Sequence, residues 1–186
     1  SHLKSKIKSY QSIRKQKMQT RELKLKQLHK TIDVLWHGVS STKEGDYPKI
    51  VNLYKEVLKL NPNDRDAWEN MIWLMWSLAI NKKDTVWLFE AEKFAKMYLS
   101  INPNGYRAYE YLGQFYRIMM TDERLAIRYY ESAIRWKDAP ETTFHSLTSL
   151  YIKTGDRISA IGNCRFNLKR YPNDPYAQSK MKELIK

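Results

Sequence analysis

Cysteine, glycine and long apolar runs are all scarce in this sequence of 186 residues. The single cysteine, Cys164, can form no disulfide within the chain and has no partner for nucleophilic catalysis, so we expect a small core residue there. The six glycines are scattered and include no phosphate-binding loop. No apolar run reaches the length of a transmembrane helix. The sequence therefore lacks the marks of a disulfide-stapled domain, a P-loop nucleotide site and a membrane-spanning chain.

Histidine is also too sparse to suggest a metal centre. None of the four histidines stands at metal-ligand spacing from a second histidine or a cysteine. They are His2, His29, His37 and His145. Carboxylates are plentiful, but ordinary solvated helix faces explain them. We therefore predict no catalytic residue, no metal ligand and no cofactor, and we expect a protein that is not an enzyme.

Proline is rare as well, yet three of the six prolines occupy near-identical turns. These turns are Asn61-Pro62-Asn63, Asn102-Pro103-Asn104 and Tyr171-Pro172-Asn173, and Asp138 stands at the corresponding place between the last two. The steps between the four markers are 41, 35 and 34 residues. A period near 34 residues predicts helical hairpins, which must stack on one another to bury their apolar faces.

Apolar residues upstream of these turns repeat with the same period. Val34, Trp68, Tyr109 and Phe144 are separated by 34, 41 and 35 residues. Each is followed after three and four residues by a pair that takes the place of Leu-Gly, and in the third copy the pair is Leu-Gly itself. The two series agree once each is assigned to its own repeat, which chance spacing would rarely give.

The repeat resembles the tetratricopeptide repeat. The third copy keeps the pattern of that family best, at Tyr109, Leu112, Gly113, Tyr116, Ala126, Tyr130 and Ala133. The fourth copy matches it at Phe144, Leu147, Tyr151, Gly155, Asp156, Ala160 and Pro172. The resemblance covers about residues 31–174.

The resemblance implies an all-α, right-handed superhelical solenoid of four antiparallel helix hairpins. The expected hairpins are residues 31–64, 65–105, 106–140 and 141–174. We expect a basic N-terminal arm or helix at 1–30 and a capping helix at 175–186, where one polar face would close the stack.

The second hairpin is seven residues longer than the others. Met75 and Ala91 are 16 residues apart, whereas Tyr151 and Ala160, at corresponding positions, are 9 apart. Seven residues are about two helical turns. We favour one extra turn on each helix over the alternative, a loop around residues 81–85.

Positive charge is concentrated at the start of the chain. The formal net charge is +13, and residues 1–30 hold ten cations against Glu22 alone, a net of +9 that leaves +4 for the other 156 residues. We therefore expect a nearly neutral array behind a basic arm. The arm cations that we assign to an anionic surface are Lys4, Lys6, Lys8, Arg14, Lys15 and Lys17.

The arm admits three interpretations: a solvated helix or linker, a surface for anionic lipid or for nucleic acid such as RNA, and a helix that docks on the array or on a second copy. Its one aromatic residue, Tyr10, weighs against nucleic acid, because base stacking uses several aromatic platforms. The chain begins with Ser1-His2 in place of methionine, so we expect the natural protein to begin upstream, with room there for an anchor or targeting segment.

In the family, the first helix of each hairpin lines a concave groove, and the resemblance implies the same here. The partner-binding residues expected from these positions are Glu69, Trp73, Trp76, Arg107, Glu110, Gln114, Arg117 and His145. Trp73 and Trp76 are the sharpest candidates, because an exposed aromatic side chain buries a large area at low entropic cost. The alternative is that both pack in the core, as we expect of Trp68.

We therefore expect a protein-protein interaction scaffold or adaptor that binds a partner peptide or helix in the groove. One alternative is that the basic arm tethers the scaffold to an anionic membrane surface or to nucleic acid. Another is self-association into a homo-oligomer, in which Ile32, Leu35 and Val39 accept a helix of a second copy.

Overall fold

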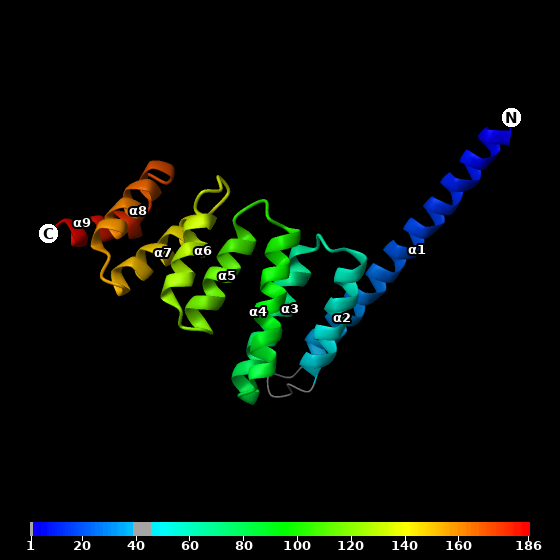
Figure 1. Ribbon diagram of the computed structural model, residues 1–186, viewed down its shortest axis with the longest axis horizontal. Coiled ribbons are helices and arrows are strands. Elements are labelled where there is room, and N and C mark those ends of the chain that lie inside the picture. Colours follow the sequence, from blue (N-terminus) through cyan, green and yellow to red (C-terminus); the bar gives the residue numbers. More distant parts are fainter. Residues whose placement is uncertain (1, 39–45) are drawn as a thin grey trace. The chain divides into compact units, whose positions relative to one another are not determined.

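The computed structural model describes residues 2–38 and 46–186, and within these ranges the chain is all-α (Figure 1). That part of the chain contains nine helices and no strand, which confirms the predicted fold class. The helices are α1 (His2–Gly38), α2 (Tyr47–Leu60), α3 (Arg65–Lys82), α4 (Thr85–Ile101), α5 (Arg107–Ile118), α6 (Glu123–Ala133), α7 (Glu141–Lys153), α8 (Arg157–Arg170) and α9 (Pro175–Ile185). None of these described helices has the length and apolar character needed to cross a bilayer.

The chain divides into two compact units. Unit 1 is Ser1–Trp87 and unit 2 is Leu88–Lys186. The boundary falls near the start of α4, inside the hairpin that the sequence places at 65–105. Each unit has its own buried core, so each is described by itself.

In unit 1, α1 packs on α2 and α2 packs on α3. The core of this unit lies along α2, where Ile50, Val51 and Val57 are fully buried. Ile32 of α1 is 2% exposed, and the indole Nε1 of Trp36 donates to the Tyr54 hydroxyl at 3.2 Å. Only the C-terminal part of α1 takes part in this packing, because every residue from 2 to 24 is exposed.

In unit 2, each helix from α5 to α9 packs on the next. Side-chain hydrogen bonds also join alternate helices. Thr143 of α7 donates to Glu110 of α5 at 2.6 Å, and Ser149 of α7 is hydrogen-bonded to Tyr176 of α9 at 2.9 Å. Side-chain bonds therefore join the hairpins' first helices α5 and α7, and join α7 to the final helix α9, while α6 packs on α5 and α7 and α8 packs on α7 and α9.

Three turns inside hairpins, all within residues 46–186, follow one local rule. A residue with positive φ is followed by an aspartate at Lys83-Asp84, Thr121-Asp122 and Gly155-Asp156, with φ of 50°, 50° and 79°. The aspartate carboxylate then accepts a hydrogen bond from a backbone N–H in the first turn of the next helix, at 2.9, 2.9 and 3.0 Å. Each of these three turns thus ends one helix and caps the next.

The seven extra residues of the second hairpin are helical. Helix α3 has 18 residues and α4 has 17, against 12 in α5 and 11 in α6. Only Lys83 and Asp84 separate α3 from α4. The expectation of longer helices in place of a loop at 81–85 is confirmed.

The turns between hairpins show why Asp138 can replace a proline. At Asn61–Asp64 and Tyr171–Asp174 the fourth residue donates its N–H to the carbonyl of the first, at 3.1 Å in both turns. In the turn around Asp138 the Ala139 N–H donates to the Trp136 carbonyl at 3.2 Å. Two side chains of the fourth repeat also hold this turn, because Arg170 donates to the Trp136 carbonyl at 2.8 Å and the Tyr171 hydroxyl donates to the Ala139 carbonyl at 2.7 Å. Donors from the following repeat thus fix the backbone that a proline would otherwise restrict.

Candidate partner-binding surface

The predicted groove residues of the third repeat lie on one stripe of α5. Arg107, Glu110, Gln114 and Arg117 follow one another at steps of three and four residues, so their side chains share one helix face. All four are half-buried. The hydrogen bond from Thr143 holds the Glu110 carboxylate toward α7. We call the stripe on α5, together with the adjoining side chains of α7 and α9, the α5/α7/α9 face.

Helix α7 carries the corresponding stripe of the fourth repeat. His145, Ser149 and Ile152 lie at steps of four and three residues, and Ile152 is 40% exposed. The His145 ring lies 4.2 Å from the Tyr176 ring of α9, measured between centroids. Because Ser149 is also bonded to Tyr176, the two stripes and α9 adjoin on the same side of unit 2. The face combines half-buried polar groups with apolar side chains such as Ile118, which is 53% exposed.

A buried carboxylate, that of Asp174, holds residues of this face in place through hydrogen bonds. Asp174, which caps α9, accepts from the Tyr176 N–H at 3.0 Å, from Asn167 Nδ2 at 2.5 Å and from His145 Nε2 at 2.7 Å. Burial alone would raise the pKa of Asp174, but the hydrogen bonds from His145 and Asn167 outweigh it and lower the pKa below its usual value. The carboxylate therefore stays charged and fixes the position of His145.

The same residues include a group with metal-ligand character. Glu141, His145 and Asp174 each offer a ligand atom, and these atoms lie within 4.8 Å of one another. No metal ligand was expected from the sequence, where this cluster is hidden because Asp174 lies 29 residues beyond His145. Both Asp174 oxygens already accept hydrogen bonds, and a cation would have to displace those donors. We interpret the cluster as the capping network of α9.

In unit 1, the two candidate tryptophans differ in exposure. Trp73 is 46% exposed, and its ring lies 6.1 Å from that of Trp36, which in turn lies 6.1 Å from the Tyr47 ring. Trp76 is 7% exposed, on the side of α3 that is buried. Glu69 is half-buried one turn before Trp73. Trp73 therefore has an indole available to a partner, and we leave Trp76 out of the proposed contact surface.

Comparison with known proteins gives matches in structure only. No protein-family model matches the sequence, and no curated protein matches it either. A crystal structure of MamA protein aligns with 87% of this chain and 80% of its own length, at 17% identity and a TM-score of 0.61. PilW, described as a widely conserved type IV pilus biogenesis factor, aligns with 89% of this chain and 69% of its own at 17% identity and a TM-score of 0.56. TTC0263, a thermophilic TPR protein of Thermus thermophilus, aligns over 89% of this chain and 98% of its own at 14% identity, with a TM-score of 0.47.

The packing of the repeat's signature residues then decides the fold. Gly113 lies so close to Tyr130 that a Cβ there would stand 2.9 Å from two ring atoms, and Ala126 and Ala133 are fully buried beside them. The chain has the tetratricopeptide-repeat fold. The tetratricopeptide pattern also gives Trp68 the core position expected for it, since Trp68 is 2% exposed and donates from Nε1 to the Pro62 carbonyl at 2.8 Å.

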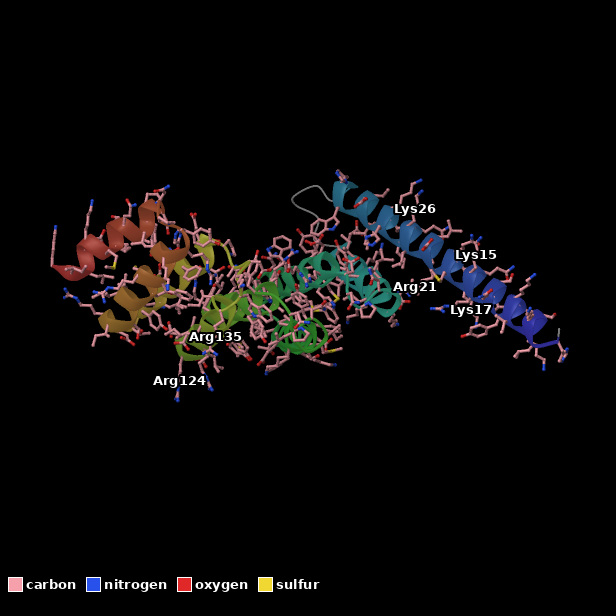
Figure 2. All side chains as sticks on the ribbon, turned by 90° about the horizontal axis from the view of Figure 1, so that it is seen from above. Lys15, Lys17, Arg21, Lys26, Arg124 and Arg135 are labelled. Atoms are coloured by element: carbon pink, nitrogen blue, oxygen red, sulfur yellow. The ribbon has the colours of Figure 1, made fainter. Side chains whose placement is uncertain are left out.

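The basic segment before the tetratricopeptide repeats is a helix. It is continuous with the segment that packs on α2, since α1 runs without a break from His2 to Gly38. All six arm cations named in the sequence analysis are exposed. Figure 2 shows Lys15 and Lys26 on one side of α1 and Lys17 and Arg21 on the other.

The residues offered for self-association are less available than the sequence suggests. Ile32 is buried in the core of unit 1, and Leu35 is half-buried. Val39 lies outside the described residues.

Proposed function

We propose that the chain is a protein-interaction scaffold and that a partner peptide binds the α5/α7/α9 face of unit 2. The observation that carries the proposal is the set of direct hydrogen bonds between first helices, Thr143 to Glu110 and Ser149 to Tyr176. A surface whose helices are already bonded to one another loses little conformational freedom on binding, which favours affinity. The proposal assigns no chemical reaction to the chain.

The side chains of this face suit an extended peptide with an acidic residue. Gln114 carries both a donor and an acceptor, as needed to pair with a peptide group. Arg117, one turn later, offers a guanidinium that can bind a carboxylate through two parallel hydrogen bonds. Ile118 and Ile152 offer apolar area beside them. We assign Arg107, Glu110 and His145 to the same contact surface.

Site-specific photocrosslinking tests the position of the surface. A photoreactive amino acid placed at Gln114 should crosslink the partner in cells, whereas one placed at exposed Arg165 on α8 should not. The crosslinked partner then serves for affinity measurements with purified proteins. Arg117→Glu should weaken binding by roughly tenfold to a hundredfold, and Arg165→Glu, which makes the same change of charge, should leave it unchanged. Equal crosslinking at both positions, or equal loss in both variants, rules out this face.

We also propose that Trp73 is a second anchor, in unit 1. Tryptophan is the residue type most enriched among binding hot spots, and this one is half exposed within an aromatic cluster. Trp73→Ala should lower the affinity for the same partner by roughly thirtyfold. Val34→Ala, at another exposed apolar side chain of unit 1, should leave the affinity unchanged. If Trp73→Ala leaves affinity unchanged, partner binding is confined to unit 2.

A further inference from the structure

The exposed half of α1 continues the line of residues that packs on α2. Steps of three and four residues lead from Leu25, Leu28 and Ile32 back along the helix through Arg21, Met18, Arg14, Tyr10, Ile7 and Leu3. The mean step along this line is about 3.6 residues, the period of an α-helix, so it marks one side of α1. We call its exposed part, with the neighbouring Ile13 and Lys17, the α1 stripe.

From Leu3 to Ile13 the α1 stripe is mainly apolar, with Lys6 beside it on the side of Ile13, and from Arg14 to Arg21 it is mainly cationic. Leu3 is 71% exposed, Tyr10 68% and Met18 53%, and Ile7 and Ile13 are also exposed. Arg14, Lys17 and Arg21 follow on the same side, and Glu22 is the only carboxylate among residues 2–30. Within unit 1, Figure 1 shows this half of α1 running clear of α2 and α3. Exposed apolar residues grouped on one side of a helix mark an interaction site.

We propose that the α1 stripe binds the surface of an anionic lipid membrane, with α1 lying along the interface. Leu3, Ile7 and Ile13 would enter the boundary between headgroups and acyl chains, where Tyr10 is also well suited. Arg14, Lys17 and Arg21 would bury their methylene stems and extend their charges to lipid phosphates. The proposal is independent of partner binding by unit 2.

Three other occupants fit the stripe less well. A second copy of α1 would bring another strongly positive segment against the first. A coiled-coil partner would need apolar residues along a seam of 3.5-residue period. The seam that starts at Leu3 and Ile7 continues through positions 14, 17, 21 and 24, which are all cationic. Nucleic acid would pair with the cations, but it would leave Leu3, Ile7 and Ile13 without a contact that repays their exposure.

Vesicle flotation of the whole chain is the first test. Vesicles of equal parts phosphatidylglycerol and phosphatidylcholine should bind the chain at least about tenfold more tightly than vesicles of phosphatidylcholine alone, and binding should weaken as salt rises. Failure to bind the anionic vesicles, or equal binding to both kinds, overturns the proposal.

Two apolar variants test whether the stripe enters the interface. Ile7→Ser with Ile13→Ser keeps every charge and should reduce binding to the anionic vesicles by about tenfold or more. Leu23→Ser removes an apolar side chain that is 58% exposed on another side of α1, and it should leave binding unchanged. If the double variant binds as well as the unaltered chain, attraction is purely electrostatic and the proposed insertion is wrong.

Two triple variants with the same change of charge test the orientation. Arg14→Gln, Lys17→Gln and Arg21→Gln together remove three cations from the stripe and should weaken binding roughly a hundredfold. Lys8→Gln, Lys15→Gln and Lys26→Gln together remove three from the opposite side of α1 and should weaken it far less. Equal losses overturn the assignment of this side of the helix.

A polarity-sensitive dye measures insertion directly. Attached through Tyr10→Cys, the dye should brighten on adding anionic vesicles, and attached through Lys8→Cys it should not. Buried Cys164 should remain unlabelled in both. Two further measurements test the other occupants. Binding of duplex DNA or RNA to the chain is measured, and sedimentation without lipid shows whether the chain dimerises. Binding to nucleic acid with no binding to vesicles, or a dimer that Ile7→Ser and Ile13→Ser abolish, overturns the proposal.

Discussion

Two glycines inside helices of unit 2 have opposite surroundings. A Cβ added to Gly113 would meet the fully buried Tyr130 ring at 2.9 Å, whereas one added to Gly162 would meet nothing within 4 Å. Gly113→Ala should therefore lower the free energy of unfolding by about 1–3 kcal/mol, the usual effect of overpacking. Gly162→Ala should raise it by about 0.5–1 kcal/mol, because alanine favours the helix. Urea unfolding of both variants checks the two signs, and a shared sign contradicts the packing described for Gly113.

We predict that removing the charge of Asp174 destabilises unit 2. Asp174→Asn keeps a side-chain oxygen to cap α9, but it places an amide against the donors of His145 and Asn167. We expect a loss of about 1–3 kcal/mol at neutral pH.

The pH dependence of that loss follows from the lowered pKa. A carboxyl group whose pKa is lower in the folded state stabilises the fold above its unfolded pKa, near 3.9, and loses this contribution as pH falls through the folded value. Denaturant unfolding of Asp174→Asn and of the unaltered chain should therefore converge below about pH 4. A difference that stays constant down to pH 2 would show that the charge of Asp174 contributes nothing.

Trp73 and Trp76 show what sequence leaves open at this scale. Both are large, aromatic and three residues apart in one predicted helix, and both were offered as partner contacts. Their exposures of 46% and 7% depend on how the lengthened α3 is covered, which the repeat pattern does not specify. The contact between His145 and Asp174 was missed for a similar reason, because it joins two helices through a carboxylate that also serves as a helix cap.

At the scale of elements, the hairpin turns use a left-handed residue with or without glycine. Gly155 adopts this conformation at φ 79°, while Thr121 occupies the corresponding place at φ 50°. A β-branched residue there carries a cost of about 1–2 kcal/mol that glycine avoids. We predict that Thr121→Gly stabilises unit 2 by about 1 kcal/mol, as measured by urea unfolding.

A control for this turn is available in α7. Thr142 is exposed and helical, so Thr142→Gly should destabilise the unit by about 0.5 kcal/mol. If both substitutions destabilise, the conformation of Thr121 is not strained.

Helices were the elements that the sequence predicted well. Prolines and an aspartate at regular steps located the turns, and the one long step located the extra helical residues of α3 and α4. The reason is local, since turns and caps are made by residues adjacent in sequence. The bonds from Arg170 and Tyr171 to the turn around Asp138 could not be found this way, because they join residues 32 to 36 positions apart.

At the scale of the whole molecule, the chain consists of two units that each bury their own core. Repeat proteins are stabilised by contacts between neighbouring repeats, so damage in one region should spread only a short distance. Leu147→Ala, at a fully buried site of α7, should cost unit 2 about 2–5 kcal/mol.

Hydrogen exchange measured by mass spectrometry tests how far this damage spreads. We predict faster exchange in α7, α8 and α9 and little change in α2, with Val57→Ala in α2 as the reciprocal variant. A uniform rise along the chain in either variant would mean that the two units unfold as one.

The continuity of α1 gives the molecule a mechanical property. A helix of 37 residues is about 55 Å long. Helix α1 has this length and is uninterrupted between the exposed stripe and the segment that packs on α2. The helix has no break between Ile7 and Ile32, so a force or a twist applied near Ile7 is transmitted to Ile32 through helical backbone alone. Whatever holds the exposed end of α1 therefore also sets the orientation of unit 1, and a pull on that end is resisted by the side chains around Ile32 and Trp36.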